Sequence, residues 1–498
     1  MTKIVLTCDR TLLSTYNDHV FLGFAACAPK TIPLWLYKRI FCPLVEEDDN
    51  QVKYAHCGQR KIEAALIEHG FKEDDIAIVN PDKLDKVVDK DTKVLGVTTH
   101  DPLGLGPAST TFSDLMNREP YTAIFFRKMI QNPVIRKYNL KVIVGGAGAW
   151  QLTDERIMAK YDIDCVVLGE GEKTGVEIIE KMINDEPYPA VAEGEVVPLD
   201  KIPLIRKPTI NGLIEICRGC GRGCRFCTPT MRNYRCQPLE YIIKEAKINV
   251  DAGNGVLLHA EDVLRYKTKG FTPDEKEVTR LFTEVRKLTD HIGISHIAHA
   301  SVAANPHLIE RLSEIVEVGS KTTPFMSGQV GVETGSPRMI EKYMKGKVKP
   351  FQPREWPDVV IKSHQILNDN KWVPANTMIM GLPGEKKEDV NKSIELVQNL
   401  SEYKSLIVPL FFVPIGNLKE NNRFFRVKHM LPEHWQLLSA CIRHSIKFSY
   451  ILADDYLGSR GMRWWKRTAI KRVIRFIDNR LKPYLKMMDE GVNPMTQM

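Results

Sequence analysis

The feature that most constrains the fold is an alternation of short apolar runs with stretches of helical spacing. In the first part of the chain, apolar runs cover residues 3–8, 75–79, 94–98, 141–144 and 165–168, and helical patterns cover 61–69, 121–138 and 174–183. Short continuous apolar runs separated by helices are typical of parallel strands that are covered on both faces. We therefore expect an α/β, doubly wound domain over residues 1–198. Residues 30–57, interrupted by Pro33 and Pro43, are expected to be an insertion or cap.

A second series follows a proline-rich connector at 187–208. Its expected strands are 212–216, 255–259, 296–301, 327–332, 374–379 and 405–413, and its expected helices are 238–250, 275–289, 306–318, 337–343 and 389–400. Six such repeats predict a partial (β/α) barrel over residues 199–415, with its chemistry at the carboxyl ends of the strands. Residues 416–498 are expected to form a mostly helical C-terminal domain.

Composition and charge exclude several classes of protein. With 43% apolar and 27% charged residues the chain is an ordinary globular protein, not a disordered one. We see no run of about 18 apolar residues that would span a membrane, and residues 20–29 do not have the flanks of a signal peptide. A cytoplasmic location is expected. The formal charge of +8 equals the charge of residues 463–486 alone, where nine Lys or Arg face one acid, Asp478.

Five of the eleven cysteines lie between Cys217 and Cys236, which favours metal ligation over a disulfide framework. Cys220, Cys224 and Cys227 have C-x3-C-x2-C spacing in a glycine-rich loop after an expected strand. Three thiolates on a four-iron cube leave one iron open, as a catalytic cluster needs. The alternative is a zinc site of two C-x2-C pairs that includes Cys217. Only three residues separate the two pairs, far fewer than in the usual zinc sites, so this alternative is less favoured.

The remaining cysteines have no ligand spacing. Cys236 is expected to be a free thiol, with a role beside the cluster as the alternative. The other six are expected to pack as small hydrophobic side chains: Cys8, Cys27, Cys42, Cys57, Cys165 and Cys441.

Two expected strands of the first domain end in glycine-bearing turns, 145–148 and 169–172. Glycine at a strand's carboxyl end lets backbone approach a ligand in the crevice of an open sheet. Tight βα turns without a ligand are the alternative. No G-x-G-x-x-G follows the first strand, so a nicotinamide or flavin dinucleotide is disfavoured.

These residues together resemble a known superfamily. The C-x3-C-x2-C loop with Phe226, placed after the first strand of a partial barrel, is similar to the radical S-adenosylmethionine (SAM) superfamily. The preceding domain with the sequence GEGE at 169–172 resembles the branch that also binds cobalamin. The resemblance covers about residues 70–415.

The resemblance implies a 4Fe-4S cluster, SAM and cobalamin as cofactors, and it implies residues for each. The cluster ligands would be Cys220, Cys224 and Cys227. The implied SAM-binding residues are Phe226, Glu261, Asp262, Glu333, Ser336, Met380 and Gly381. The implied cobalamin-binding residues are Thr99, His100, Asp101, Leu103, Gly145, Gly146, Gly148, Gly169, Glu170 and Gly171. Singly, each motif is also compatible with a capped strand-to-helix turn.

The sequence departs from many cobalamin proteins in one respect, because the D-x-H-x-x-G loop is absent after the first strand. His100-Asp101-Pro102-Leu103 follows the third strand instead. The resemblance therefore implies cobalamin without a histidine on cobalt, its lower face against apolar surface such as Leu103 or an unidentified side chain. Such a cobalt favours cycling between a cob(I) nucleophile and methylcobalamin.

The resemblance implies a C-methyltransferase that acts on an unactivated carbon through a 5'-deoxyadenosyl radical. The cluster loop and the opening residues 5–12 are similar to archaeal members of this branch. Among them we favour those that methylate a glutamine of methyl-coenzyme M reductase, a protein substrate. Alternatives are an archaeal lipid-modifying enzyme, a small-molecule C-methyltransferase, and a non-enzymatic cobalamin or iron–sulfur carrier or sensor. The implied electron donor is a ferredoxin or flavodoxin, and no nucleic-acid partner is expected.

The tail combines basic residues with an apolar helical stripe. Ile470, Val473, Ile474, Ile477 and Leu481 recur at helical intervals after Trp464 and Trp465. This pattern suits docking on an acidic protein, nucleic acid or an anionic membrane. We favour a macromolecular substrate, and a membrane surface is a less favoured partner. The alternative is a packed helix with a solvated basic face.

Overall fold

The computed structural model describes residues 2–16, 20–420, 423–459 and 464–497. The chain forms two compact units, which we describe separately. The first unit consists of residues 1–214 and 240–254, and the second of residues 215–239 and 255–498. The predicted three-domain division stays a prediction.

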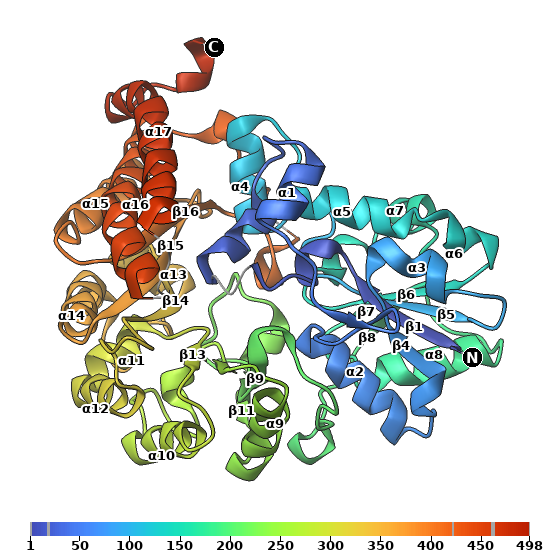
Figure 1. The fold of residues 1–498 in the computed structure, drawn as a ribbon. Helices are drawn as coiled ribbons and strands as arrows, with labels where there is room; N and C mark the ends of the chain where they lie inside the picture. Colours follow the sequence, from blue (N-terminus) through green and yellow to red (C-terminus); the bar gives the residue numbers. More distant parts are fainter. Residues whose placement is uncertain (1, 17–19, 421–422, 460–463, 498) are drawn as a thin grey trace. The chain divides into compact units, whose positions relative to one another are not determined.

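A six-stranded sheet forms the centre of the first unit (Figure 1). The strand order is β4-β1-β5-β6-β7-β8, and each neighbouring pair is parallel. The strands are β1 (Ile4–Cys8), β4 (Ile76–Ile78), β5 (Val94–Thr98), β6 (Lys141–Gly145), β7 (Cys165–Leu168) and β8 (Val191–Glu193). The predicted α/β fold with a parallel sheet is confirmed. The sequence did not reveal β8, which lies in the proline-rich connector.

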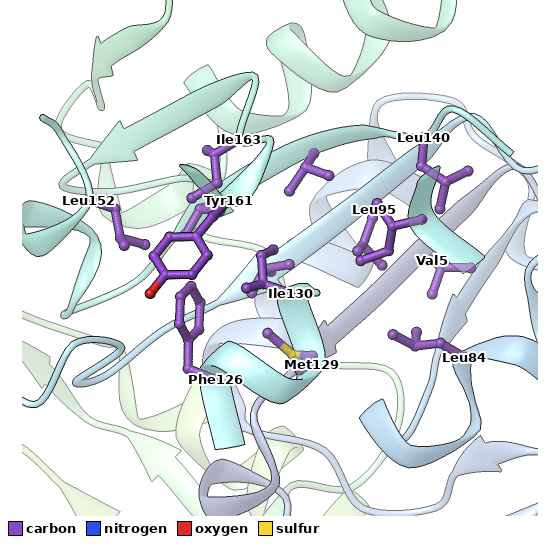
Figure 2. Close-up of a cluster of buried hydrophobic side chains, with 14 of the residues drawn as sticks. Val5, Leu84, Leu95, Phe126, Met129, Ile130, Leu140, Leu152, Tyr161 and Ile163 are labelled. Carbon is purple, nitrogen blue, oxygen red and sulfur yellow. The ribbon is translucent and has the colours of Figure 1, made fainter. Parts of the chain in front are cut away.

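Alternate residues of these strands enter two separate apolar cores. Val5, Leu95 and Val142 belong to one core, together with Phe126 and Tyr161, which lie edge to face (Figure 2). Ile4, Val94 and Ile143 belong to the other core. The sheet is therefore buried on both faces, as its uninterrupted apolar strands predict.

The helices of the first unit follow the strands. They are α2 (Cys57–Glu68), α3 (Leu84–Val87), α4 (Pro107–Met116), α5 (Tyr121–Ile130), α6 (Pro133–Lys137), α7 (Glu155–Tyr161), α8 (Thr174–Ile183) and α9 (Leu239–Asp251). The single helix expected over 121–138 is wrong. Asn132 caps α6 by accepting the Val134 N–H, and Pro133 occupies the first helical position, so the chain starts a new helix there.

Residues 30–57 contain α1 (Leu34–Ile40) and a short hairpin of β2 (Glu47–Asp48) and β3 (Gln51–Val52). Tyr37 of α1 stacks on Tyr121 of α5 with ring centroids 3.6 Å apart. Arg10 and Lys38 both pair with Asp82, at 2.8 Å and 2.7 Å. These contacts fix the segment to the sheet domain.

Two further three-stranded sheets are ordered β13-β12-β9 and β14-β15-β16, and all their strands except β9, which begins in the first unit, belong to the second unit. The strands are β9 (Leu213–Glu215), β12 (Val256–His259), β13 (Ile292–Ile294), β14 (Met326–Glu333), β15 (Trp372–Met380) and β16 (Leu406–Phe411). A parallel bridge between His296 and Gln329 connects the two sheets. The strand predicted over 296–301 is wrong, because β13 ends at Ile294 and α11 begins at His299. The alanines of that segment favour a helix.

The second unit also contains several helices. They are α10 (Glu275–Arg286), α11 (His299–Ala304), α12 (Pro306–Val316), α13 (Pro337–Tyr343), α14 (Trp356–Asp369), α15 (Lys387–Asn399), α16 (Pro432–Ser459) and α17 (Trp464–Asp489). Helix α14 was not predicted. Within the described ranges we find no helix that combines the length and the apolar character of a membrane span.

A buried ion pair joins α2 to α9 within the first unit. Lys61 Nζ lies 2.5 Å from Glu245 Oε1, and both side chains are at most 3% exposed. The same oxygen accepts the Ile205 N–H at 3.0 Å. Both charges are removed from water, so each compensates the other. Removing one of them would leave an uncompensated charge in the interior and destabilise the fold.

We predict that Lys61→Met lowers the free energy of unfolding by about 3–5 kcal/mol, because it leaves Glu245 buried and uncompensated. Lys3→Met is the matched control. It removes an exposed pair with Asp75 and should cost at most about 1 kcal/mol. Urea unfolding measures both variants, and equal midpoints for the two would contradict the prediction.

Candidate functional site

The cluster loop lies between two short antiparallel strands, β10 (Cys217–Arg218) and β11 (Arg235–Cys236). Cys217 and Cys236 face each other in this ladder and form a disulfide. The prediction that Cys236 is a free thiol is therefore wrong, because the hairpin register aligns it with a residue 19 positions earlier. The zinc alternative loses Cys217, whose sulfur is bonded to Cys236.

The loop between these strands holds Cys220, Cys224 and Cys227 as free thiols. The Cys220 and Gly221 N–H groups both donate to the Met231 carbonyl, which draws the loop into a tight arch. Gly219 has a φ of +69°, and a side chain there would collide with the Asn233 carbonyl. The arch therefore requires glycine at this position.

Arg222 fixes the loop to its surroundings. One Nη lies 3.0 Å from Asp262 Oδ2 and donates to Ser301 Oγ at 2.9 Å. The other Nη donates to the carbonyls of Gly346, Lys347 and Lys349. Arg222 and Asp262 are 6% and 4% exposed. The guanidinium thus ties the cysteine loop to the end of β12 and to the segment after α13.

The thiols differ in their electrostatic environment. Burial, with smaller contributions from Cys224 and Glu261, raises the pKa of Cys220. A hydrogen bond with Cys227 lowers the pKa of Cys224 to about 7, and nearby Lys347 also favours its thiolate. The same hydrogen bond raises the pKa of Cys227. Cys224 is therefore the thiol of this group that ionises first.

Lys347 is a charged residue of the site that the sequence did not reveal. Its Nζ lies 2.9 Å from Glu333 Oε1, and its side chain is 16% exposed. Burial opposes its charge, but Glu333 and Cys224 outweigh burial and raise the pKa of Lys347. A buried cation beside thiolates stabilises negative charge there. Lys347 belongs to no recognisable motif, so only the fold places it beside the loop.

The described residues contain no group of three or more His, Cys, Asp or Glu side chains close enough to hold a single metal ion. Thiolates that bind three corners of an iron–sulfur cube lie farther apart than ligands of one ion. Three free thiols on one glycine-rich arch are the donor set of a cube with one open iron. The residues therefore fit a 4Fe-4S cluster.

The two acids after β12 have different environments. Asp262 accepts hydrogen bonds from Arg222, from Ser301 Oγ at 2.6 Å and from the Ala298 N–H at 3.3 Å. Glu261 is half-buried and close enough to Cys220 to act on its pKa. Glu261 is therefore the acid better placed to meet a ligand at the cluster. Phe226, in the loop itself, is half-buried.

Glu333 is held in a strained backbone conformation at the end of β14. Its φ is +65°, at an irregularity in the pairing of β14 with β15. Besides Lys347, it accepts a hydrogen bond from Thr377 Oγ1 at 3.3 Å. A non-glycine residue with positive φ at a strand end is typical of functional sites.

The other residues that the resemblance implies for SAM lie at the ends of β14 and β15. Ser336 caps α13 and donates to Asp389 Oδ1 at 2.5 Å. Met380 is fully buried and its carbonyl accepts the Phe412 N–H. Gly381 donates its N–H to Glu385 Oε2 at 2.7 Å. Ser336 and Gly381 are thus engaged in shaping their turns, and a role toward SAM stays a prediction.

In the first unit, the implied cobalamin residues follow the carboxyl ends of the neighbouring strands β5, β6 and β7. Thr99 donates to the Gly145 carbonyl through its N–H and its hydroxyl. Gln151 bridges the first loop, because it donates to Asp101 Oδ1 and accepts the Leu103 N–H. A side chain at Gly146, whose φ is +92°, would collide with Thr99 backbone. The β5 and β6 loops are therefore packed as one rigid edge.

The remaining implied positions border this edge. His100 is exposed, and Leu103 packs against the core beneath it. A side chain at Gly148 would collide with the His100 backbone. Gly169 and Gly171 flank Glu170, whose Oε2 accepts the Val197 N–H at 3.0 Å. The exposed turn backbone is accessible to a ligand along the edge.

Several buried polar atoms of this unit lack a partner among the described residues. Among them are Gln59 Nε2, Ser109 Oγ and Thr110 Oγ1, in side chains at most 1% exposed. Gln59 contacts Cys8 at the end of β1, and α4, which carries the two hydroxyls, follows the β5 loop. Asp9 lies at the same end of β1, where burial raises its pKa to about 6. Buried donors without partners fit a polar cofactor with many amide and phosphate oxygens, as cobalamin has.

Residues 214–397 match the family model described as the Radical SAM superfamily. This segment is similar to radical SAM domains. This domain implies a 4Fe-4S cluster and SAM, in agreement with the three-thiol arch at 220–227.

Two solved structures of the radical SAM methyltransferase TsrM from Kitasatospora setae share the fold. One has cobalamin and a [4Fe-4S] cluster bound and gives a TM-score of 0.56 at 13% identity, covering 84% of this chain and 77% of TsrM. The other has tryptophan and a SAM analogue bound and gives 0.55 at 12% identity, covering 84% and 75%. At this identity the likeness shows the fold alone.

Curated relatives include tRNA-2-methylthio-N(6)-dimethylallyladenosine synthases. That of Paraburkholderia phymatum is 24% identical over 59% of this chain and 64% of its own length. That of Burkholderia ambifaria is 24% identical over 47% and 52%. The chain thus spans less than two thirds of the length of these relatives.

We predict that replacing Cys220, Cys224 or Cys227 by Ala abolishes the visible iron–sulfur absorbance after anaerobic reconstitution, because each thiolate holds one corner of the cube. Cys217→Ala is the control, since Cys217 is bonded to Cys236. It should keep its iron and its absorbance. Complete loss of iron in Cys217→Ala would contradict the three-ligand assignment.

Proposed function

We propose that this protein is a cobalamin-dependent radical SAM C-methyltransferase that acts on an unactivated carbon. The observation that carries the proposal is the three-thiol arch anchored by Arg222 within the segment that matches the Radical SAM superfamily. The fold shared with TsrM supports it, since TsrM is a methyltransferase with cobalamin and a cluster bound.

The chain's own residues supply binding and electrostatics. When bound, the cluster provides the electron that cleaves SAM to a 5'-deoxyadenosyl radical, and cobalamin carries the methyl group. Cys220, Cys224 and Cys227 would hold three irons of the cluster, and Arg222 keeps their loop in place. Glu261, beside Cys220, would accept hydrogen bonds from the amino group of SAM. Lys347 balances the negative charge of the thiolates.

Cobalamin is proposed to bind at the carboxyl edge of the first unit's sheet. The turns at 145–148 and 169–171 contribute backbone, and the buried Gln59 amide, Ser109 and Thr110 contribute donors that lack partners among the described residues. His100 is exposed and outside a D-x-H-x-x-G motif. We therefore propose that no histidine binds cobalt.

The proposed substrate is a glutamine side chain of methyl-coenzyme M reductase, on the basis of the similarity of the loop and of residues 5–12 to archaeal members of the branch. An archaeal lipid or a small molecule is the alternative substrate, and a cofactor carrier or sensor is the non-enzymatic alternative. A ferredoxin or flavodoxin is the proposed electron donor. The cytoplasmic location stays a prediction.

We predict that Gly146→Trp abolishes cobalamin binding, because a side chain at this φ displaces the turn. Gly175→Ala, in α8, is the control, since its added methyl group would meet no atom within 4 Å. Titration of each variant with cob(II)alamin, followed by its electron paramagnetic resonance spectrum, gives the affinity. Nitrogen hyperfine coupling from an imidazole in the wild-type spectrum would contradict the proposed cobalt environment.

We predict that the reconstituted enzyme forms 5'-deoxyadenosine together with S-adenosylhomocysteine and adds 14 Da to its substrate, about the mass of one CH2 group. Glu261→Gln should slow SAM cleavage at least about tenfold, because a charge-assisted hydrogen bond is lost. Glu310→Gln, on the exposed side of α12, is the matched control. Product analysis by mass spectrometry measures both rates.

Absence of 5'-deoxyadenosine from protein that retains its cluster would favour the carrier or sensor. Formation of 5'-deoxyadenosine without S-adenosylhomocysteine would contradict methyl transfer.

A further inference from the structure

The C-terminal helix α17 leaves apolar side chains in solvent. It lies alongside α16 (Figure 1), against which Leu485 and Met488 are buried. Val473, Phe476 and Ile477 are 57%, 60% and 48% exposed. At positions i, i+3 and i+4 they lie on one side of the helix. The predicted single apolar stripe is thus divided, because Ile474 and Leu481 are half-buried while these three are not.

The solvent-exposed part of α17 also carries positive charge that no acid in the described parts of the chain neutralises. Arg472, Arg475, Arg480 and Lys486 form no ion pair with an acid in the described parts of the chain. The two acids of the helix are already engaged, Asp478 by Lys482 at 3.7 Å and Asp489 by Arg443 at 2.6 Å. The Arg480 guanidinium lies 5.5 Å from the centroid of the Phe476 ring.

We propose that this face, defined as Arg472, Val473, Arg475, Phe476, Ile477 and Arg480, docks a partner protein whose surface is acidic around an apolar socket. Arginine pairs with carboxylates in a two-pronged geometry and costs less to desolvate than lysine. Aromatic residues and arginines are enriched among the few residues that contribute most of the binding energy in protein interfaces. The exposed Phe476 ring has arginines on both sides of it in the sequence. The cations steer an acidic partner toward the helix, and Phe476 and its neighbours hold it by apolar burial.

The distribution of apolar residues distinguishes a protein partner from a membrane. A helix that lies in a lipid interface presents an apolar face along its length. Here the next residue on the apolar side after Phe476 and Ile477 is Arg480, and Tyr484 beyond it is half-buried. Among the side chains of α17 described from residue 471 on, the exposed apolar patch therefore extends over about one turn. A short apolar patch suits a socket on a protein.

The docking face itself does not depend on the reaction. Only the identity of its occupant, the protein substrate, rests on the proposed function. Binding and catalysis can therefore be tested separately.

The binding test uses the full-length protein and four probes. These are a fluorescent peptide of alternating Glu and Leu blocks that forms an acidic amphipathic helix, a Glu-only peptide of equal length, and vesicles of phosphatidylcholine with and without phosphatidylglycerol. The variants are Phe476→Ser and the triple variant Arg472→Glu, Arg475→Glu, Arg480→Glu. The matched control reverses three exposed cations elsewhere, Lys276→Glu, Arg280→Glu and Lys321→Glu.

We expect the amphipathic peptide to bind more tightly than the Glu-only peptide. Phe476→Ser and the triple reversal should each raise its Kd about tenfold or more, and the control should change it less than about twofold. The effect of the triple reversal should shrink at high salt, because salt screens exposed charges. Circular dichroism verifies that each variant is folded.

Other outcomes overturn the proposal. Binding to anionic vesicles but to neither peptide would identify a membrane-docking helix. Self-association that Phe476→Ser abolishes would identify a contact between copies of this chain. An unchanged Kd in both variants would show a solvated face. The triple reversal should leave 5'-deoxyadenosine formation without a partner unchanged, and absence of that product in the wild type would count against the proposed function alone.

Discussion

The buried guanidinium of Arg222 is the interaction on which the site depends. It donates to the Asp262 carboxylate, to Ser301 and to three carbonyls after α13. A cysteine loop with several glycines has little intrinsic rigidity, and three thiolates bind a cube only if their spacing is maintained. The guanidinium supplies that rigidity at the cost of burying a charge, which Asp262 compensates.

The contacts of Arg222 with the segment after α13 also explain the electrostatics of the site. The segment that Arg222 holds after α13 contains Lys347, which therefore lies beside Cys224 and pairs with Glu333. The strained backbone of Glu333 persists because the pair and the bond from Thr377 hold its carboxylate. The first unit has a comparable cost at the carboxyl edge of its sheet. Buried hydroxyl and amide groups there have no partner among the described residues. In both units, therefore, a strained backbone or buried polar groups lower the stability of the fold at the places where we propose that ligands bind.

The sequence was most informative where the signal is local. The cysteine spacing and the apolar strands could be predicted because ligand spacing and buried parallel strands leave short-range patterns. The pairing of Cys217 with Cys236 could not, because it depends on the register of two strands of two residues each. Lys347 was missed because a lone lysine carries no motif until the fold places it beside the thiols. The strand expected at 296–301 failed because a short apolar run fits a buried helix equally well.

The central claim is that SAM binds to the open iron of a cluster held by three cysteines. Electron–nuclear double resonance on the reduced, reconstituted protein with SAM labelled with nitrogen-15 at its amino group tests this claim most directly. We expect hyperfine coupling of the label to the cluster, which disappears when unlabelled SAM replaces the labelled SAM. A cluster spectrum that SAM leaves unchanged, with no coupling to the label, would contradict it.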